Sequence, residues 1–180
     1  MTSPLRSRFD RLDVAITAAL ANWSLPVLRI GLGIVFLWFG ALKFVPGLSP
    51  AEDLATRTIE DLTFGAVRPA VSLPFLAAWE SVIGLGLISG RFLRATLFLL
   101  AVQLVGTLAP LVLYPSETFT RFPYAPTLEG QYIIKNVVLI GAAMVVGSTV
   151  RGGRIVPDPE AADIAESVAP TDPATPGRAP

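Results

Sequence analysis

The sequence contains no histidine and no cysteine, and only 16% of its 180 residues are charged. The two missing residue types exclude disulfides, Cys/His zinc sites, thiolate-bound iron–sulfur clusters and histidine-bound haem. They also exclude catalysis by a thiolate or an imidazole. The 14 basic and 14 acidic residues cancel, so the chain lacks the basic excess of nucleic-acid-binding domains. We therefore expect no nucleic-acid partner, no metal site, and no cofactor held by histidine or cysteine.

The chain is poor in charge and rich in long apolar stretches. Hydrophobic residues make up 52% of the chain, and the mean hydropathy is +0.61. Such stretches could instead be buried core helices of a soluble protein. A soluble domain, however, has about 25% charged residues to cover its helices, and this chain has too few. The apolar residues form four blocks, each long enough to cross a hydrocarbon core of about 30 Å, at 26–45, 71–89, 95–113 and 132–150. The sequence predicts an all-α protein, with a four-transmembrane-helix bundle over residues 25–154.

Shorter segments flank and connect these blocks. Residues 1–24 predict an amphipathic helix lying in the membrane interface, with apolar side chains at Leu5, Phe9, Leu12, Ile16, Leu20 and Trp23. A short interfacial helix is expected over 50–62, where a proline and acidic residues begin the first turn. The connection at 91–94 is so short that the second and third blocks must form an antiparallel hairpin. The tail at 155–180, rich in proline and acidic residues, is predicted to be disordered.

Basic residues are divided unequally between the two sides of the predicted spans. With the N terminus in the cytoplasm, eight lie on the cytoplasmic side, namely Arg6, Arg8, Arg11, Arg29, Arg91, Arg94, Arg151 and Arg154. Five lie on the other side, namely Lys43, Arg57, Arg68, Arg121 and Lys135. Because cytoplasmic loops carry an excess of Lys and Arg, we expect both termini in the cytoplasm. The expected location is the bilayer of the cytoplasmic (inner) cell membrane.

A few polar residues interrupt the apolar blocks and form the candidate site, namely Lys43, Glu80, Gln103, Lys135 and Asn136. Charged side chains within a span are costly and mark functional sites. Glu80 lies at a depth comparable with that of the two lysines, on a different block. One interpretation is an ion pair that only fixes helix order and register. The other is a polar pocket, open to the outer face, for a quinone headgroup, a proton or a small anion.

Two further groups of residues are candidates for packing or binding. Small residues let membrane helices approach closely, and we assign helix packing to Gly33, Gly40, Gly86 and Gly90. The segment 114–131 combines prolines with aromatic and charged residues. It is interpreted either as a stiff lid over an outer pocket or as a simple turn at the membrane surface. Its candidate binding residues are Arg121, Tyr124 and Glu129.

Two motifs resemble the DoxX family of small bacterial membrane proteins. The first is RIGLGIVFLWFGALKF at 29–44, and the second places Glu80, Gly84, Gly90 and Arg94 in matching order. The resemblance covers roughly residues 26–150, although the fourth block ends in GSTVRGGR where many members have a Gly-Pro-Gly-Arg segment. It implies a four-helix membrane bundle. It also implies a link to respiratory and sulfur redox chemistry, because DoxX and DoxD relatives are associated with thiosulfate:quinone oxidoreductase.

Three functions remain open from the sequence. The first is a membrane subunit or anchor of an oxidoreductase assembly, which contacts quinone and other redox subunits but is not an enzyme alone. The second is a small solute or proton transporter that uses the same intramembrane charges. The third is a membrane scaffold without chemistry.

Overall fold

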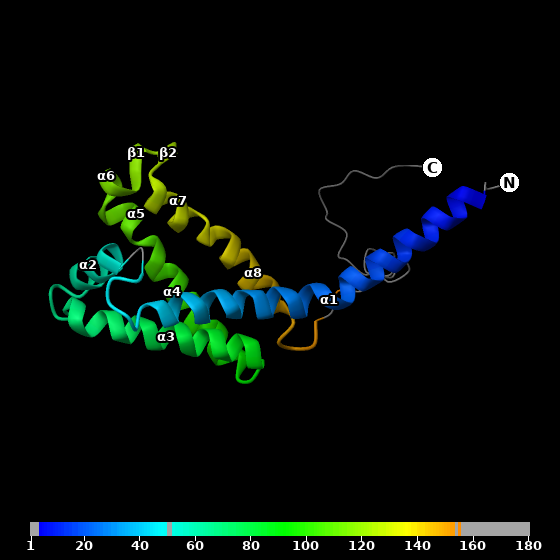
Figure 1. Cartoon of the computed structure of the whole chain (residues 1–180), viewed down its shortest axis with the longest axis horizontal. Helices are drawn as coiled ribbons and strands as arrows, with labels where there is room; N and C mark the ends of the chain where they lie inside the picture. The colour runs from blue at the N-terminus through cyan, green and yellow to red at the C-terminus, as the bar shows by residue number, and fades with distance from the viewer. Residues whose placement is uncertain (1–3, 50–51, 154, 156–180) are drawn as a thin grey trace, which may run out of the picture. The chain divides into compact units, whose positions relative to one another are not determined.

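The computed structural model describes residues 4–49, 52–153 and 155. The elements, labelled in Figure 1, are α1 Pro4–Leu42, α2 Glu52–Leu62, α3 Pro69–Ser89, α4 Leu93–Leu108, α5 Pro110–Leu113, α6 Pro115–Thr118, β1 Phe119–Arg121, β2 Ala125–Pro126, α7 Leu128–Ile134 and α8 Asn136–Ser148. The predicted tail, except for Ile155, lies outside the described residues. So does Pro50, at which the short helix of 50–62 was expected to begin.

The described residues contain four helical stretches that are long and apolar enough to cross a membrane. They run over Leu12–Leu42, Pro69–Ser89, Leu93–Leu113 and Leu128–Ser148. The third combines α4 with α5, and the fourth combines α7 with α8. The prediction of an all-α protein built on four membrane helices is thereby confirmed. The two-stranded pair β1–β2 is a small addition to it.

The chain divides into two compact units, of which one contains Met1–Ser24 with Arg154–Pro180 and the other Leu25–Gly153. In the first unit the described residues belong mainly to α1, and apolar side chains such as Leu12 and Leu20 are exposed. We expected an interfacial helix that ends before the first span, but α1 continues through Pro26. A proline removes one backbone hydrogen bond, and membrane helices tolerate this loss when neighbouring groups compensate.

The second unit is the helix bundle, in which glycines join α1 closely to α3. A Cβ added at Gly33 would lie 2.8 Å from Cγ1 of Ile88, and one at Gly40 would lie 2.8 Å from the backbone nitrogen of Ser81. At Gly84 it would lie 2.5 Å from the backbone nitrogen of Leu37. The two helices therefore meet backbone to backbone, as small residues allow in lipid.

The apolar core lies where α1, α3 and α4 converge. Its buried members are Leu32, Phe36, Ile83, Leu87, Leu100 and Leu104. Helix α8 packs against α4 and adds Leu139, Ile140, Ala142 and Ala143 to the rim of this core. Gly86 lets Thr96 of α4 approach α3. The hairpin predicted from the short connection is therefore closely packed.

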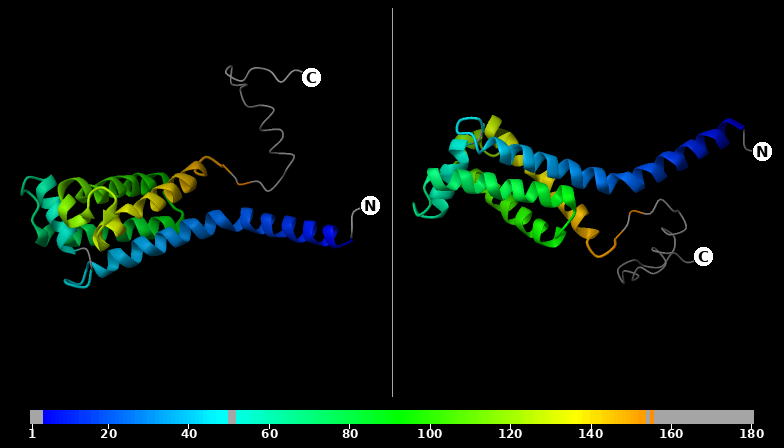
Figure 2. Two further views of the ribbon diagram at one scale, coloured as in Figure 1. Left: turned by 90° about the horizontal axis from the view of Figure 1, so that it is seen from above. Right: turned by 60° about the horizontal axis from the view of Figure 1, so that its bottom comes forward.

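The bundle has two dissimilar ends, visible in Figures 1 and 2. At the turn end, α3 and α4 are joined through Gly90, whose φ of +68° ends α3 in the left-handed conformation that glycine adopts readily. At the loop end, α2 packs against α3 and α5, and α6 packs against α7. The pair β1–β2 also lies there. The loop end is therefore a folded cap rather than an irregular loop.

Candidate functional site

The polar cluster, which we define as Lys43, Glu80 and Gln103, joins three different helical stretches near the loop end. Lys43 Nζ donates to Glu80 Oε2 at 2.6 Å, and each of these two side chains is only 10% exposed. Gln103 Nε2 donates to the other carboxylate oxygen, Oε1, at 2.8 Å. Both oxygens of the Glu80 carboxylate are therefore bonded. Such bonding is required for a charge to be retained in a buried environment.

The local sequence explains how these side chains meet. Gly40 lies one helical turn before Lys43, and it faces Glu80 because a Cβ there would lie 2.9 Å from Glu80 Cβ. The glycine brings the α1 backbone close enough for the lysine to reach the carboxylate while a second Nζ–H donates to Phe39 O at 3.3 Å. On α4, Gln103 is buried and reaches the other oxygen of the same carboxylate.

The structure separates the remaining candidates from this cluster. Asn136 Nδ2 donates to Thr107 Oγ1 at 3.3 Å, and Thr107 lies one turn beyond Gln103 on α4. A second polar contact therefore joins α8 to α4. Lys135 lies at the junction of α7 and α8, with Nζ 5.3 Å from the ring centroid of Tyr132. It is exposed and belongs to a cation–π contact rather than to the polar cluster.

One buried polar atom outside the polar cluster belongs to Trp79, a residue that the sequence analysis did not select. Trp79 Nε1 is buried and has no hydrogen-bond partner among the described residues. Trp79 precedes Glu80 on α3, packs against the apolar core and stacks at a tilt on Phe75. A buried indole N–H usually finds an acceptor. Its only sequence signal was its position next to an intramembrane acid.

Arg29 is a further partly buried charged side chain outside the predicted site. Its guanidinium donates to the backbone carbonyls of Leu87 and Ile88, the latter at 3.1 Å. These carbonyls belong to the last turn of α3, where unpaired acceptors and the helix dipole favour a cation. A Cβ at Gly90 would lie 2.8 Å from Nη1 of Arg29. Glycine at that position thus leaves room for the guanidinium.

A network of charged and aromatic side chains holds the loop end together. Arg57 of α2 donates through Nη1 and Nη2 to the two carboxylate oxygens of Glu117, at 3.1 and 2.5 Å. Its guanidinium also lies 5.0 Å from the centroid of the Tyr114 ring. The Tyr114 hydroxyl donates to Asp61 Oδ2. The segment from Tyr114 to Glu117 is therefore fastened to α2, a connection that the sequence analysis did not predict.

The same contacts change the protonation behaviour of the exposed groups. The hydrogen bond from Arg57, and secondarily its positive charge, lowers the pKa of Glu117. The hydrogen bond to Asp61 raises the pKa of the Tyr114 hydroxyl. A carboxylate whose pKa is lowered by folding stabilises the fold above its unfolded pKa, and this contribution is lost as pH falls through the folded pKa.

We expect the Arg57–Glu117 pair to make stability depend on pH in the acidic range. At neutral pH, Glu117→Gln should lower the Tm by a small amount, because exposed ion pairs contribute little. The difference between the two proteins should shrink once pH falls below the ordinary pKa of glutamate and vanish below the lowered pKa of Glu117 in the folded protein. Melting curves of both proteins across this range measure it, with Glu129→Gln as the control. A Tm difference that stays constant with pH would contradict the assignment.

The outer-loop candidates lie apart from the polar cluster. Arg121 ends β1, Tyr124 lies in the turn before β2, and Glu129 lies in the first turn of α7. All three are exposed. Among the described residues, none of their side chains forms a hydrogen bond with another. Nor does the described part of the chain contain a group of three or more acidic residues able to hold a metal ion.

Comparisons with known proteins bear on the geometry just described. The family model for DoxX matches residues 24–113, which contain Arg29, the polar cluster and the glycine contact between α1 and α3. No curated protein and no solved structure matches the chain. The match spans half of the 180 residues and includes both motifs on which the resemblance was based. On this match and on its membrane helices, the chain belongs to the DoxX family.

Proposed function

We propose that this DoxX protein is a membrane subunit of an oxidoreductase assembly, and that its polar cluster binds the headgroup of a quinone. The observation that carries the proposal is the ion pair of Lys43 with Glu80, placed between two membrane helices and joined by Gln103. Ionisable groups in a span are rare and mark substrate or proton sites by default. The same pair also fixes the α1–α3 contact, so a test must separate binding from packing.

The hydrogen-bonding capacity of these side chains fits a quinone. A lysine ammonium has three donors, and Lys43 uses one on Glu80 and one on Phe39 O. The Gln103 amide has two donors, and one goes to Glu80. Each therefore retains an N–H for the carbonyl oxygen of a headgroup. The buried Trp79 Nε1–H is a further donor without a described partner.

The lipid-facing side of α1 provides apolar surface for a prenyl tail. A shallow groove near Lys43 is lined by Ile34, Leu37, Trp38, Ala41, Leu42 and Leu48. Its walls are almost wholly apolar, as expected of a surface that contacts hydrocarbon. A quinone whose headgroup reached the polar cluster would have this groove beside it for the tail.

A bound quinone would supply two-electron, two-proton chemistry. The chain itself would orient the headgroup through Lys43, while Glu80 would hold a proton at its carboxylate. Without cysteine or histidine, it has no thiolate or imidazole to bind a redox centre, so the proposed electron donor is another subunit. With both termini in the cytoplasm of an inner-membrane protein, as the basic residues favour, the polar cluster would lie toward the outer side.

A charge-swapped variant, Lys43→Glu/Glu80→Lys, separates the two roles of the ion pair. We expect it to keep the pair and the fold but to lose the proposed donor geometry. Quinone that co-purifies in mild detergent should fall by about tenfold or more, since a hydrogen bond to a charged group contributes about 1.5–3 kcal/mol. Quinone per chain is measured by solvent extraction and chromatography.

Lys135→Gln is the matched control, because it removes a lysine that lies outside the polar cluster, and it should leave the quinone content unchanged. Flavin- or metal-bearing subunits that co-purify with the unaltered chain would support the assembly. Unchanged quinone content in the charge-swapped variant would contradict the binding role. Proton- or ion-linked uptake by the chain alone in liposomes would favour a transporter instead.

A further inference from the structure

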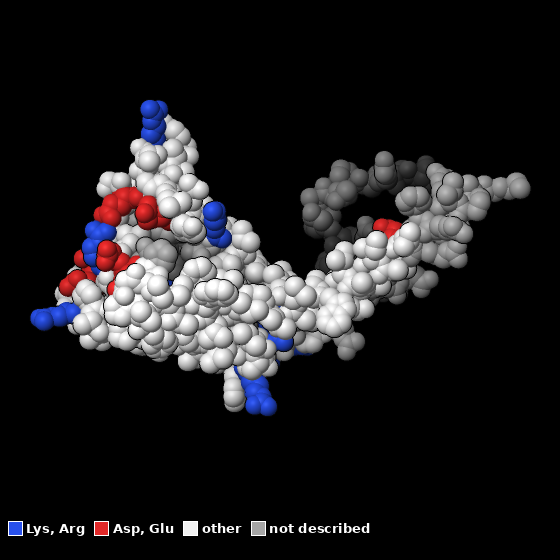
Figure 3. Space-filling model, in the orientation of Figure 1, with Lys and Arg blue, Asp and Glu red and all other residues white. Residues whose placement is uncertain are grey.

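The turn end of the bundle carries positive charge without described acids. Between residues 25 and 153, the described acids other than Glu80 all lie in the loop-end elements, namely Glu52, Asp53, Glu60, Asp61, Glu117 and Glu129. Figure 3 shows these carboxylates gathered around α2 and its neighbours. The turn end instead carries Arg29, Arg91, Arg94 and Arg151. An anion is therefore attracted to this end of the bundle.

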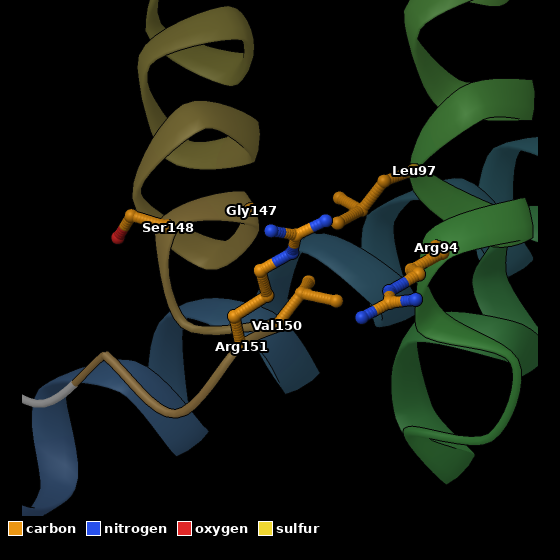
Figure 4. Close-up of a pocket in the computed structure, with 6 residues that line it drawn as sticks. All are labelled: Arg94, Leu97, Gly147, Ser148, Val150 and Arg151. Carbon is orange, nitrogen blue, oxygen red and sulfur yellow. The ribbon is translucent and has the colours of Figure 1, made fainter.

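Two of these arginines line one cleft between α4 and α8. Its walls are formed by Arg94, Leu97, Gly147, Ser148, Val150 and Arg151. Figure 4 shows both guanidinium groups reaching into the space between the two helices. A Cβ on Gly147 would lie 3.8 Å from Cδ1 of Leu97, so these two residues face each other across the cleft. The cleft, of about 370 Å³, is within the size range of small-molecule sites.

The position of Arg94 is not explained by the stability of its own helix. It lies in the first turn of α4, which begins at Leu93, and a cation near a helix N-terminus is unfavourable. Arg151, in contrast, follows the C-terminus of α8, where a cation is favoured. No described residue offers either guanidinium a carboxylate. An anion bound between them would reduce the repulsion between two like charges that enter one cleft.

We propose that this cleft binds the phosphate of an anionic membrane lipid. The guanidinium fork matches phosphate oxygens in a bidentate geometry. Leu97 and Val150 give the cleft apolar walls at the end of two membrane helices, where the first carbons of an acyl chain would lie. Basic pockets between transmembrane helices hold anionic lipid headgroups in this way. The apolar walls distinguish a lipid from free phosphate, which offers no hydrocarbon to cover them.

Native mass spectrometry of the full chain in detergent tests the proposal with phosphatidylglycerol, phosphatidylcholine and inorganic phosphate as separate probes. Phosphatidylglycerol should bind more tightly than phosphatidylcholine. Arg94→Gln and Arg151→Gln should each weaken it about fivefold, the equivalent of ~1 kcal/mol per basic residue at a membrane surface. Arg91→Gln, in the connection just before α4 and outside the cleft, is the matched control and should bind like the unaltered chain.

Three results would overturn the proposal. Equal affinity for the two lipids would show that the lipid charge has no role. If Arg91→Gln weakened lipid binding as much as Arg94→Gln does, the effect of the arginines would be general electrostatic attraction rather than binding in the cleft. Competition by millimolar inorganic phosphate would make the site one for free phosphate. The double variant Arg94→Lys/Arg151→Lys keeps both charges and guards against misfolding. It should bind more weakly than the unaltered chain and more tightly than the double glutamine variant.

Discussion

Replacement of Glu80 by leucine should lower the free energy of unfolding of the bundle by about 3–5 kcal/mol, the range found when one partner of a buried ion pair is removed. The change leaves the Lys43 ammonium, now 2.6 Å from Glu80 Oε2, without a counter-charge beside the membrane core. It also removes the acceptor of the Gln103 amide. Unfolding in a mixed detergent, followed by tryptophan fluorescence, measures the loss.

The double variant Lys43→Leu/Glu80→Leu is the informative comparison. Replacing a whole buried pair by apolar side chains is often neutral or stabilising, so this variant should recover most of the stability that Glu80→Leu loses. Glu129→Leu removes an exposed carboxylate and should change stability by less than about 0.5 kcal/mol. If Glu80→Leu were as stable as the unaltered protein, the ion pair would have no part in holding α1 to α3.

Substitution of Gly84 by alanine should destabilise the bundle by about 1–3 kcal/mol, the usual cost of overpacking. The added methyl group would lie 2.5 Å from the backbone nitrogen of Leu37 and 2.7 Å from the carbonyl oxygen of Gly33. Both neighbours are backbone atoms of α1, so relief requires the two helices to separate. The same detergent unfolding measurement applies.

Gly31→Ala and Gly141→Ala are controls for which no loss of stability is expected. Both glycines are within membrane helices, and a Cβ at either would meet nothing within 4 Å. Because alanine is the better helix former by about 1 kcal/mol, these variants should be neutral or more stable. A Gly84→Ala variant that behaved like Gly31→Ala would show that α1 and α3 do not approach as closely as the structure places them.

The membrane helices could be predicted from the sequence because contact with lipid restricts composition over whole spans. The block at 71–89 corresponds to the candidate span Pro69–Ser89, and that at 95–113 to Leu93–Leu113. The relation between the amphipathic segment 1–24 and the first span, near Pro26, was harder to predict. Hydropathy locates the membrane but does not say whether an amphipathic segment before it continues in the same helix.

The members of the polar cluster could be predicted only in part. The depth of a side chain in the membrane follows from its position in the chain, but the direction in which it points depends on helix packing. Lys135 and Asn136 lie at nearly the same depth, but successive helical residues differ by about 100° in direction. Asn136 contacts Thr107 of α4, and Lys135 contacts Tyr132 of its own helical stretch. Their rotation about the helix axis is set by how α8 packs on α4, for which the sequence has no simple periodic signal.

The network of charged and aromatic side chains at the loop end could not be predicted from the sequence, for a different reason. Arg57 and Glu117 are 60 residues apart, and both belong to short helices at the surface. Exposed charges are common at such positions, and neither spacing nor hydropathy identifies which of them will pair. Only the folding of α5 and α6 against α2 brings the two side chains together.

The two attachments of α1 to α3 restrict how the bundle can move. Arg29 binds carbonyls at the end of α3, and Lys43 binds Glu80 about 21 Å farther along α1 at 1.5 Å per residue. Between them the glycine contacts leave no room for sliding or rotation. The part of α1 from Arg29 to its end should therefore move with α3 as one body, and any opening or closing of the bundle should displace α4, α8 or the loop-end cap relative to that body.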